Sequence, residues 1–265
     1  MQMEVQMQIS FSNIGFALED DTKVYKLLKA LGYTGVEIAP LRFVGDAPYD
    51  KLDAAAQKRT DINREYGFVI PSMQSIWYGM QGNIFIKEDA LRLMEYSKKA
   101  VSFAKAIACK SLVFGCPKNR NIPIGAKPSD AEGFFCELAQ YAFDNGTAIA
   151  LEANPSVYGT NFINTSKDAF AFAKNIPHLK VNYDFGTFIT NEENLDTLYQ
   201  NLDLVSHVHI SEPSLACITK RKEHKELAAL LESGGYKGFV SVEMARSEYN
   251  AVETAAEYIA EVFAK

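Results

Sequence analysis

The sequence predicts a single-domain α/β protein, a (β/α)8 or TIM barrel that occupies residues 1–265. Three observations favour this fold class. Short apolar or β-branched segments alternate with longer segments of helical periodicity, and eight such pairs fill the chain. The strand segments are apolar almost throughout, as in a parallel sheet that helices cover. No linker rich in proline, glycine or serine divides the sequence, so a second domain is not expected.

Each predicted strand is a run of apolar or β-branched residues, and the runs lie at residues 7–11, 35–40, 68–75, 111–116, 148–154, 179–185, 205–211 and 238–244. Each predicted helix has apolar residues three and four positions apart, and the helices lie at 23–33, 52–67, 88–108, 129–146, 166–176, 192–202, 224–235 and 251–264. Gly32, Gly67 and Gly146 are typical helix stops. Ser129 is expected to cap the fourth helix, with Glu132 in the capping-box position.

A doubly wound open sheet is the alternative architecture. That fold usually carries a glycine-rich phosphate turn after its first strand. Here the corresponding segment, residues 12–21, reads SNIGFALEDD and does not fit G-x-G-x-x-G. The barrel is therefore preferred.

The composition excludes several classes of partner. The formal net charge of −6 disfavours nucleic-acid binding, because an acidic surface repels phosphate backbones. No apolar run is long enough to span a bilayer, and residues 1–11 do not read as a signal peptide. The four cysteines form no C-x-x-C pair and are expected to be reduced thiols. We expect a cytoplasmic protein. A homodimer is one possible oligomeric state, and the sequence leaves this question open.

Ionisable residues stand at or near the carboxyl ends of four successive predicted strands, where barrel active sites form; they are Glu152, Asp184, His209 and Glu243. Three carboxylates and an imidazole at one barrel mouth would repel each other without a cation. Pairing with basic residues is the alternative, but Lys180 is the only lysine or arginine in these strands. One divalent ion fits better: Mn²⁺ is the preferred candidate, with Mg²⁺, Co²⁺ or Zn²⁺ as alternatives.

The order and spacing of these residues resemble the sugar isomerase and epimerase superfamily with a xylose isomerase-like TIM barrel. The segments GYTGVEIAP, HVHISE and YKGFVSVEMA carry the resemblance, which extends over the whole chain. The superfamily includes ketose 3-epimerases, inosose dehydratase and endonuclease IV. The resemblance implies that Glu152, Asp184, His209 and Glu243 bind one metal ion. It also implies that Glu152 and Glu243 exchange protons with a small sugar or polyol derivative next to its carbonyl, through a metal-stabilised enediolate.

The sequence departs from the ketose 3-epimerases at two positions. Thr187 stands where they place a histidine, and Leu215 where they place an arginine. These departures leave the substrate open, and a metal-dependent dehydratase of an inosose-like keto-polyol is the alternative function. A phosphodiesterase like endonuclease IV is less favoured, because it needs more histidines than the four present. A non-catalytic sugar binder is a further alternative.

Other residues are weaker candidates. His207 shares a face with His209 one layer deeper, and we expect it to be either a core histidine or an outer support of the metal site. Six residues are candidates for substrate binding: Glu37, Gln74, Trp77, Asn154, Glu212 and Lys118. Their alternatives are ordinary: Trp77 could anchor a loop, and Glu212 and Lys118 could be solvated.

Overall fold

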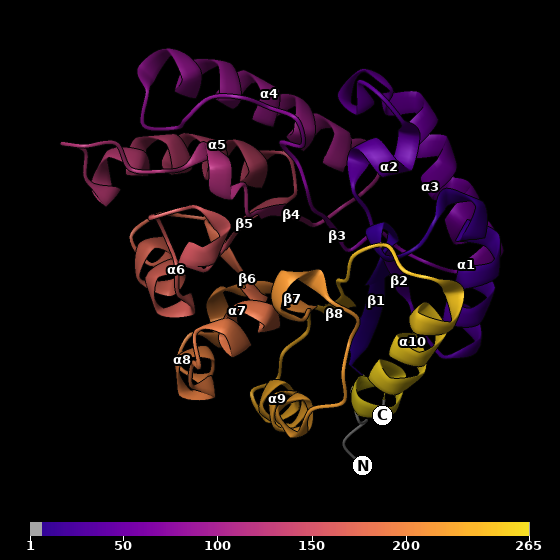
Figure 1. The fold of residues 1–265 in the computed structure, drawn as a ribbon. Helices are drawn as coiled ribbons and strands as arrows, with labels where there is room; N and C mark the ends of the chain where they lie inside the picture. Colours follow the sequence, from indigo (N-terminus) through magenta and orange to yellow (C-terminus); the bar gives the residue numbers. More distant parts are fainter. Residues whose placement is uncertain (1–6, 265) are drawn as a thin grey trace.

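The computed structural model describes residues 7–264, and its eight parallel strands form a barrel inside a ring of helices (Figure 1). Residues 1–6, which belong to the segment where no signal peptide is expected, lie outside the described residues. The hydrogen-bonded order of the strands is β2-β1-β8-β7-β6-β5-β4-β3. Their bounds are β1 Gln8–Ser12, β2 Gly35–Glu37, β3 Ser72–Met73, β4 Ser111–Phe114, β5 Ala148–Glu152, β6 Lys180–Asp184, β7 Val205–Ile210 and β8 Phe239–Val242.

The barrel closes between β2 and β3, the weakest seam. Two isolated parallel bridges join them, Gly35 to Val69 and Ile38 to Met73. The strand predicted at residues 68–75 is regular only at Ser72–Met73. Pro71 interrupts it, because proline has no N–H to give to a ladder. The closed (β/α)8 barrel is the predicted fold.

The helices are α1 Asp21–Ala30, α2 Pro40–Val44, α3 Leu52–Tyr66, α4 Lys87–Ala106, α5 Glu132–Asp144, α6 Ser166–Ala173, α7 Phe185–Thr190, α8 Leu195–Tyr199, α9 Lys222–Ser233 and α10 Tyr249–Phe263. The short helices α2 and α7 were not predicted. The expected cap at Ser129 is wrong, because this residue lies inside a 3₁₀ turn, Pro128–Ala131, and α5 starts only after it. Asp130 makes the local contact instead, accepting from the Lys127 N–H at 2.9 Å.

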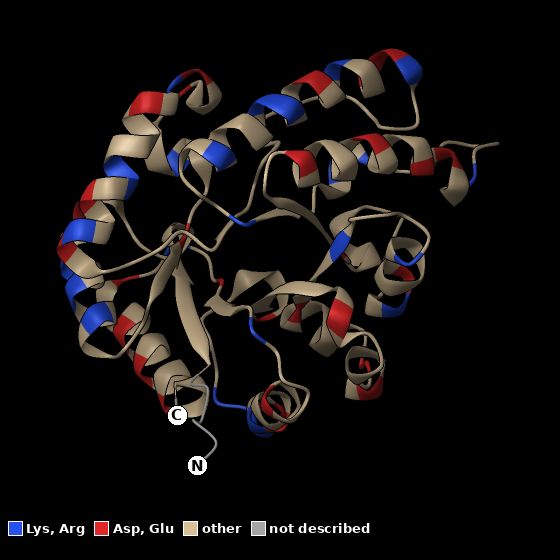
Figure 2. Ribbon diagram, turned by 180° about the vertical axis from the view of Figure 1, so that it is seen from behind, with Lys and Arg blue, Asp and Glu red and all other residues tan. Residues whose placement is uncertain are grey.

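Charged residues lie mainly on the outer helices, while the strands are largely uncharged (Figure 2). Between residues 7 and 264, no helix is long and apolar enough to cross a membrane. The acidic side chains that do lie on the strands, Glu37, Glu152 and Asp184, are each the last residue of a strand, so they lie toward the carboxyl end of the barrel.

Candidate metal centre

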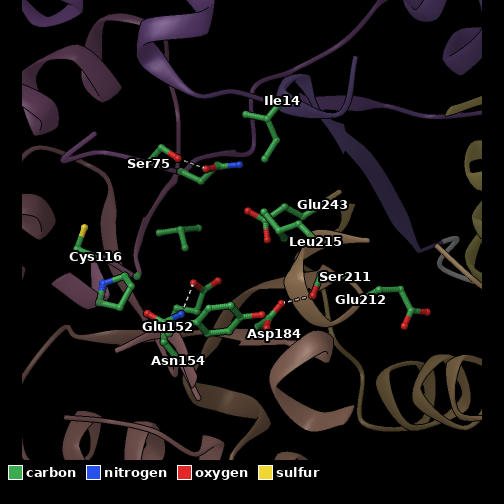
Figure 3. Close-up of a pocket in the computed structure, with 15 residues that line it drawn as sticks. Ile14, Ser75, Cys116, Glu152, Asn154, Asp184, Ser211, Glu212, Leu215 and Glu243 are labelled. Carbon is green, nitrogen blue, oxygen red and sulfur yellow. Dashed lines mark hydrogen bonds between the residues drawn. The ribbon is translucent and has the colours of Figure 1, made fainter. Parts of the chain in front are cut away.

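The four ionisable strand residues converge at the carboxyl end of the barrel. Glu152 and Asp184 are the last residues of β5 and β6, His209 is the fifth residue of β7, and Glu243 follows β8 directly. The strand register places Asp184 beside His209. Glu152, Asp184 and Glu243 line a cavity of about 280 Å³, as Figure 3 shows.

The donor atoms of Glu152, Asp184, His209 and Glu243 all lie within 4.8 Å of one another. His209 Nδ1 is 3.2 Å from Glu152 Oε1 and 3.2 Å from Glu243 Oε2. Three carboxylate oxygens and one imidazole nitrogen are a donor set that suits Mn²⁺, Mg²⁺, Co²⁺ or Zn²⁺. The residues therefore fit a divalent cation.

Glu37 holds the other side of the His209 ring. Its Oε2 lies 2.8 Å from His209 Nε2 and accepts a hydrogen bond from Ser72 Oγ at 2.6 Å. His207 Nε2 lies 3.0 Å from the same oxygen. A carboxylate on the far nitrogen is the usual arrangement behind a metal-binding histidine, because it fixes the ring orientation. Glu37 is fully buried and is not among the residues that line the cavity. It contacts both His209 and His207, and its predicted role in substrate binding stays a prediction.

The pKa values of these groups reflect burial first and neighbouring charges second. Burial raises the pKa of Glu243 to about 7. Burial also raises the pKa of Asp184, and the charge of Glu152 adds to the effect. Burial would lower the pKa of His209, but Glu37 and Glu243 outweigh it and raise that pKa well above the usual value. Positive charge is thus strongly favoured at this position, which is what a bound cation supplies.

Asp184 is held by the start of α7. Its Oδ2 accepts from the Thr187 N–H at 2.7 Å and from the Thr187 hydroxyl at 2.8 Å. Its Oδ1 accepts from the Ser211 hydroxyl, which in turn accepts from the Gly186 N–H at 2.8 Å. Thr187, the first departure from the ketose 3-epimerase pattern, therefore orients Asp184.

Two asparagines hold Glu152. Asn182 donates to its Oε1 at 2.7 Å, and Asn154 donates to its Oε2 at 3.2 Å. Arg120 donates from Nη2 to Asn154 Oδ1 at 2.7 Å. The Arg120 side chain is fully buried, and its Nε and Nη1 have no hydrogen-bond partner in the described part of the chain. Asn154, a predicted substrate-binding residue, contacts Glu152, whereas Asn182 and Arg120 were not predicted.

A family model supports the fold assignment. The model of the xylose isomerase-like TIM barrel matches residues 25–264. The chain belongs to this family. Comparison with curated proteins finds no match.

Several solved structures share the fold of this xylose isomerase-like barrel. It aligns with a 3-keto-D-glucoside 4-epimerase from E. coli at a TM-score of 0.76 and 20% identity, over 97% of this chain and 99% of the other. A D-allulose 3-epimerase from Methylomonas sp. aligns at 0.75 and 19% identity, over 97% and 96%. A D-psicose 3-epimerase from Clostridium cellulolyticum H10 aligns at 0.75 and 14% identity, over 98% and 100%.

Two other residues predicted to bind substrate, Gln74 and Glu212, line the wall of the cavity. Gln74 is buried there and receives a hydrogen bond from Ser75. Glu212 borders the cavity, but its carboxylate points away from Asp184 in Figure 3 and pairs with Arg221. The Thr219 hydroxyl also donates to it, at 2.6 Å. The sugar-binding role predicted for Glu212 would require this ion pair to open.

Trp77 and Lys118 do not line the cavity. Trp77 is buried, donates from Nε1 to Ser97 Oγ at 2.8 Å and packs edge-on against Phe114. Trp77 therefore anchors its loop, as in the alternative to substrate binding given above. Lys118 is exposed and lines a neighbouring depression of about 510 Å³. Direct substrate contact by either residue is thus not supported by their positions.

Proposed function

We propose that this protein is a divalent-metal-dependent isomerase or epimerase of a small sugar or polyol derivative. The observation that carries the proposal is the convergence of Glu152, Asp184, His209 and Glu243 within 4.8 Å at a cavity on the carboxyl end of the barrel. The three solved structures described above are sugar epimerases, and their shared fold is consistent with this chemistry.

The same four residues would hold the metal ion, with Mn²⁺ as the first candidate. When bound, such an ion supplies positive charge that polarises a substrate carbonyl and offsets the negative charge that develops beside it. Glu37 would keep the Nδ1 side of His209 facing the cavity, because it engages Nε2. Thr187 and Ser211 would keep both oxygens of Asp184 in place.

Glu152 and Glu243 are the proposed proton-transfer pair. They come from β5 and β8, with β6 and β7 between them, so their carboxylates approach the cavity from two sides. One carboxylate would take the proton from the carbon next to the carbonyl, and the other would return a proton to the opposite face of the deprotonated substrate, which gives the epimer. Asn154 and Asn182 hold Glu152 at both oxygens, so its carboxylate is already oriented before substrate binds.

A substrate screen in D₂O tests the proposal. The purified protein with Mn²⁺ is incubated with ketoses, inososes and their phosphates, and the products are followed by NMR. We expect an isomer or epimer that carries solvent deuterium on the carbon next to the carbonyl. Release of water with an unsaturated or keto product would instead identify a dehydratase at the same centre. Conversion that proceeds equally well in the Glu152→Gln and Glu243→Gln variants would contradict the proposed mechanism.

A further inference from the structure

A second cavity lies at the opposite, amino-terminal end of the barrel; we call it the basal cavity. It has a volume of about 450 Å³. Its wall includes Ser111 and Phe239, the first residues of β4 and β8, and Ser206 near the start of β7. Arg59 of α3 closes one side. The proposed function makes no use of this cavity.

Three cationic side chains surround the basal cavity without a counter-charge. They are Arg59, Lys110 and Lys237, and no aspartate or glutamate is among the residues that line it. Within residues 7–264, Arg59 and Lys237 have neither an ion pair nor a hydrogen bond, and Arg59 Nε is buried without a partner. Lys110 reaches only the carbonyl of Gly146, at 3.3 Å. Three positive charges around one cavity repel each other, and a bound anion would offset that repulsion.

The wall of the basal cavity also offers neutral polar groups. The hydroxyls of Ser111 and Ser206 lie 3.1 Å apart at its edge. His207, which is only 1% exposed, lines the cavity as well. Its Nε2 is engaged by Glu37 and Ser72, whereas its Nδ1 has no hydrogen-bond partner in the described chain. An almost fully buried ring on this wall thus has one nitrogen without a hydrogen-bond partner in the described chain, which a ligand or water can engage.

We propose that the basal cavity binds a small phosphate monoester. Guanidinium, ammonium and hydroxyl donors are the groups that recognise phosphate oxygens. The cavity is larger than a phosphate ion needs, and Val69 and Phe239 give it an apolar side for the organic part of the ligand. His207 and Glu37 lie between this cavity and His209, so the basal site is separate from the candidate metal centre.

Phosphate titration tests the proposal independently of catalysis. The protein is first stripped with a chelator, so that phosphate cannot bind through a metal ion in the cavity of the candidate metal centre, which we call the upper cavity. Inorganic phosphate and phenyl phosphate are then titrated by calorimetry and by thermal unfolding, with chloride at equal ionic strength as the reference. We expect saturable binding of both, with tighter binding of phenyl phosphate because of the apolar wall.

Charge removal locates the binding. The Arg59→Gln/Lys237→Gln variant should bind both probes at least ~10-fold more weakly, because hydrogen bonds from charged donors are lost. The matched control Arg64→Gln/Lys225→Gln removes the same charge outside the cavity and should bind as the wild type does. Lys237→Gln alone, at an exposed loop position, should show a smaller weakening and serves if the double variant does not fold. Equal affinity in the Lys237→Gln variant and the wild type, or no effect of phosphate beyond that of chloride, would overturn the proposal.

Discussion

The two glutamates of the candidate centre have unequal surroundings. Amide groups of Asn154 and Asn182 hold both oxygens of Glu152. For Glu243, His209 is the one side-chain partner in the described structure. Glu152 is therefore the more rigidly oriented of the pair. The Glu243 carboxylate has fewer partners and is freer to move when it accepts or donates a proton.

Replacing either glutamate by glutamine should remove its proton transfer while keeping its shape. We expect Glu152→Gln and Glu243→Gln each to lose at least ~10²-fold in kcat, the usual contribution of general acid–base catalysis. Glu65→Gln, an exposed change on α3, is the control and should leave kcat unaltered. Steady-state kinetics on the substrate found by the screen provide the measurement. Near-normal kcat in both site variants would exclude the pair.

Arg120 hydrogen-bonds Asn154 rather than Glu152 itself, so its removal should affect the orientation of Glu152 more than substrate binding. Burial lowers the pKa of Arg120 to about 10, which still leaves it charged at neutral pH. Arg120→Met keeps the volume but releases the Asn154 amide. We expect kcat to fall about 10-fold with a smaller change in KM, because hydrogen bonds to charged groups contribute about 1.5–3 kcal/mol. The free energy of unfolding should change little, since two guanidinium nitrogens are unpaired already. A variant that loses stability but keeps kcat would show that Arg120 is purely structural.

The first turn of α7 links the fold to the metal site. A Cβ at Gly186 would lie 2.6 Å from Ser211 Oγ and 3.3 Å from Asp184 Oδ2. Gly186→Ala should therefore displace Ser211 and weaken Mn²⁺ binding by about 10-fold, through the loss of a hydrogen bond to a charged carboxylate. Gly133→Ala in α5 meets nothing within 4 Å and is the matched control. Calorimetric Mn²⁺ titration compares the two, and equal affinities would refute the role of this close approach.

A buried histidine near the start of α9, His224, should make the free energy of unfolding depend on pH. His224 is fully buried, lies 3.1 Å from the Tyr258 hydroxyl of α10 and packs on Phe185 of α7. Burial lowers its pKa from 6.5 to about 4. Below pH 6.5 His224 becomes protonated in the unfolded chain but stays neutral in the folded protein. The free energy of unfolding therefore falls as the pH drops towards 4.

His224→Phe removes the titrating imidazole while keeping an aromatic ring at this position. Between pH 7 and pH 5 the wild type should lose about 2 kcal/mol more of its unfolding free energy than the variant does, at 1.36 kcal/mol per pKa unit. Urea unfolding at both pH values measures this difference, and the contribution of the metal centre cancels between the two proteins. Parallel pH profiles would contradict the assignment.

Sequence patterns predicted the long helices, the strands and the ionisable residues at the strand ends. They did not predict the side-chain contacts across the barrel. Glu152, Asp184 and Glu243 could be recognised because charged residues interrupt or end apolar strands. The support of His209 by Glu37 could not, because it joins residues that are 172 positions apart. In the segment PKNR, residues 117–120, nothing in the sequence distinguishes the buried Arg120 from the exposed Lys118. Helices of five and six residues, α2 and α7, are too short for periodicity to be detected.

The whole molecule places two polar cavities at opposite ends of one barrel. The upper cavity is lined by carboxylates at the carboxyl ends of the strands, and the basal cavity by cations at their amino ends. The first suits a metal ion and a polyol, the second an anion. Arg59 and Lys237 have no contact with the residues of the metal centre, so their replacement tests the basal cavity alone within the described chain.

Metal content after dialysis tests the central claim most directly. Wild-type protein loaded with Mn²⁺ should retain one ion per chain in elemental analysis, because four donors surround one position. His209→Ala should lose most of this metal. His178→Asn, at the amino-terminal side of β6 and at a left-handed backbone position that asparagine tolerates, should keep it. Full metal retention by His209→Ala would contradict the account of the centre.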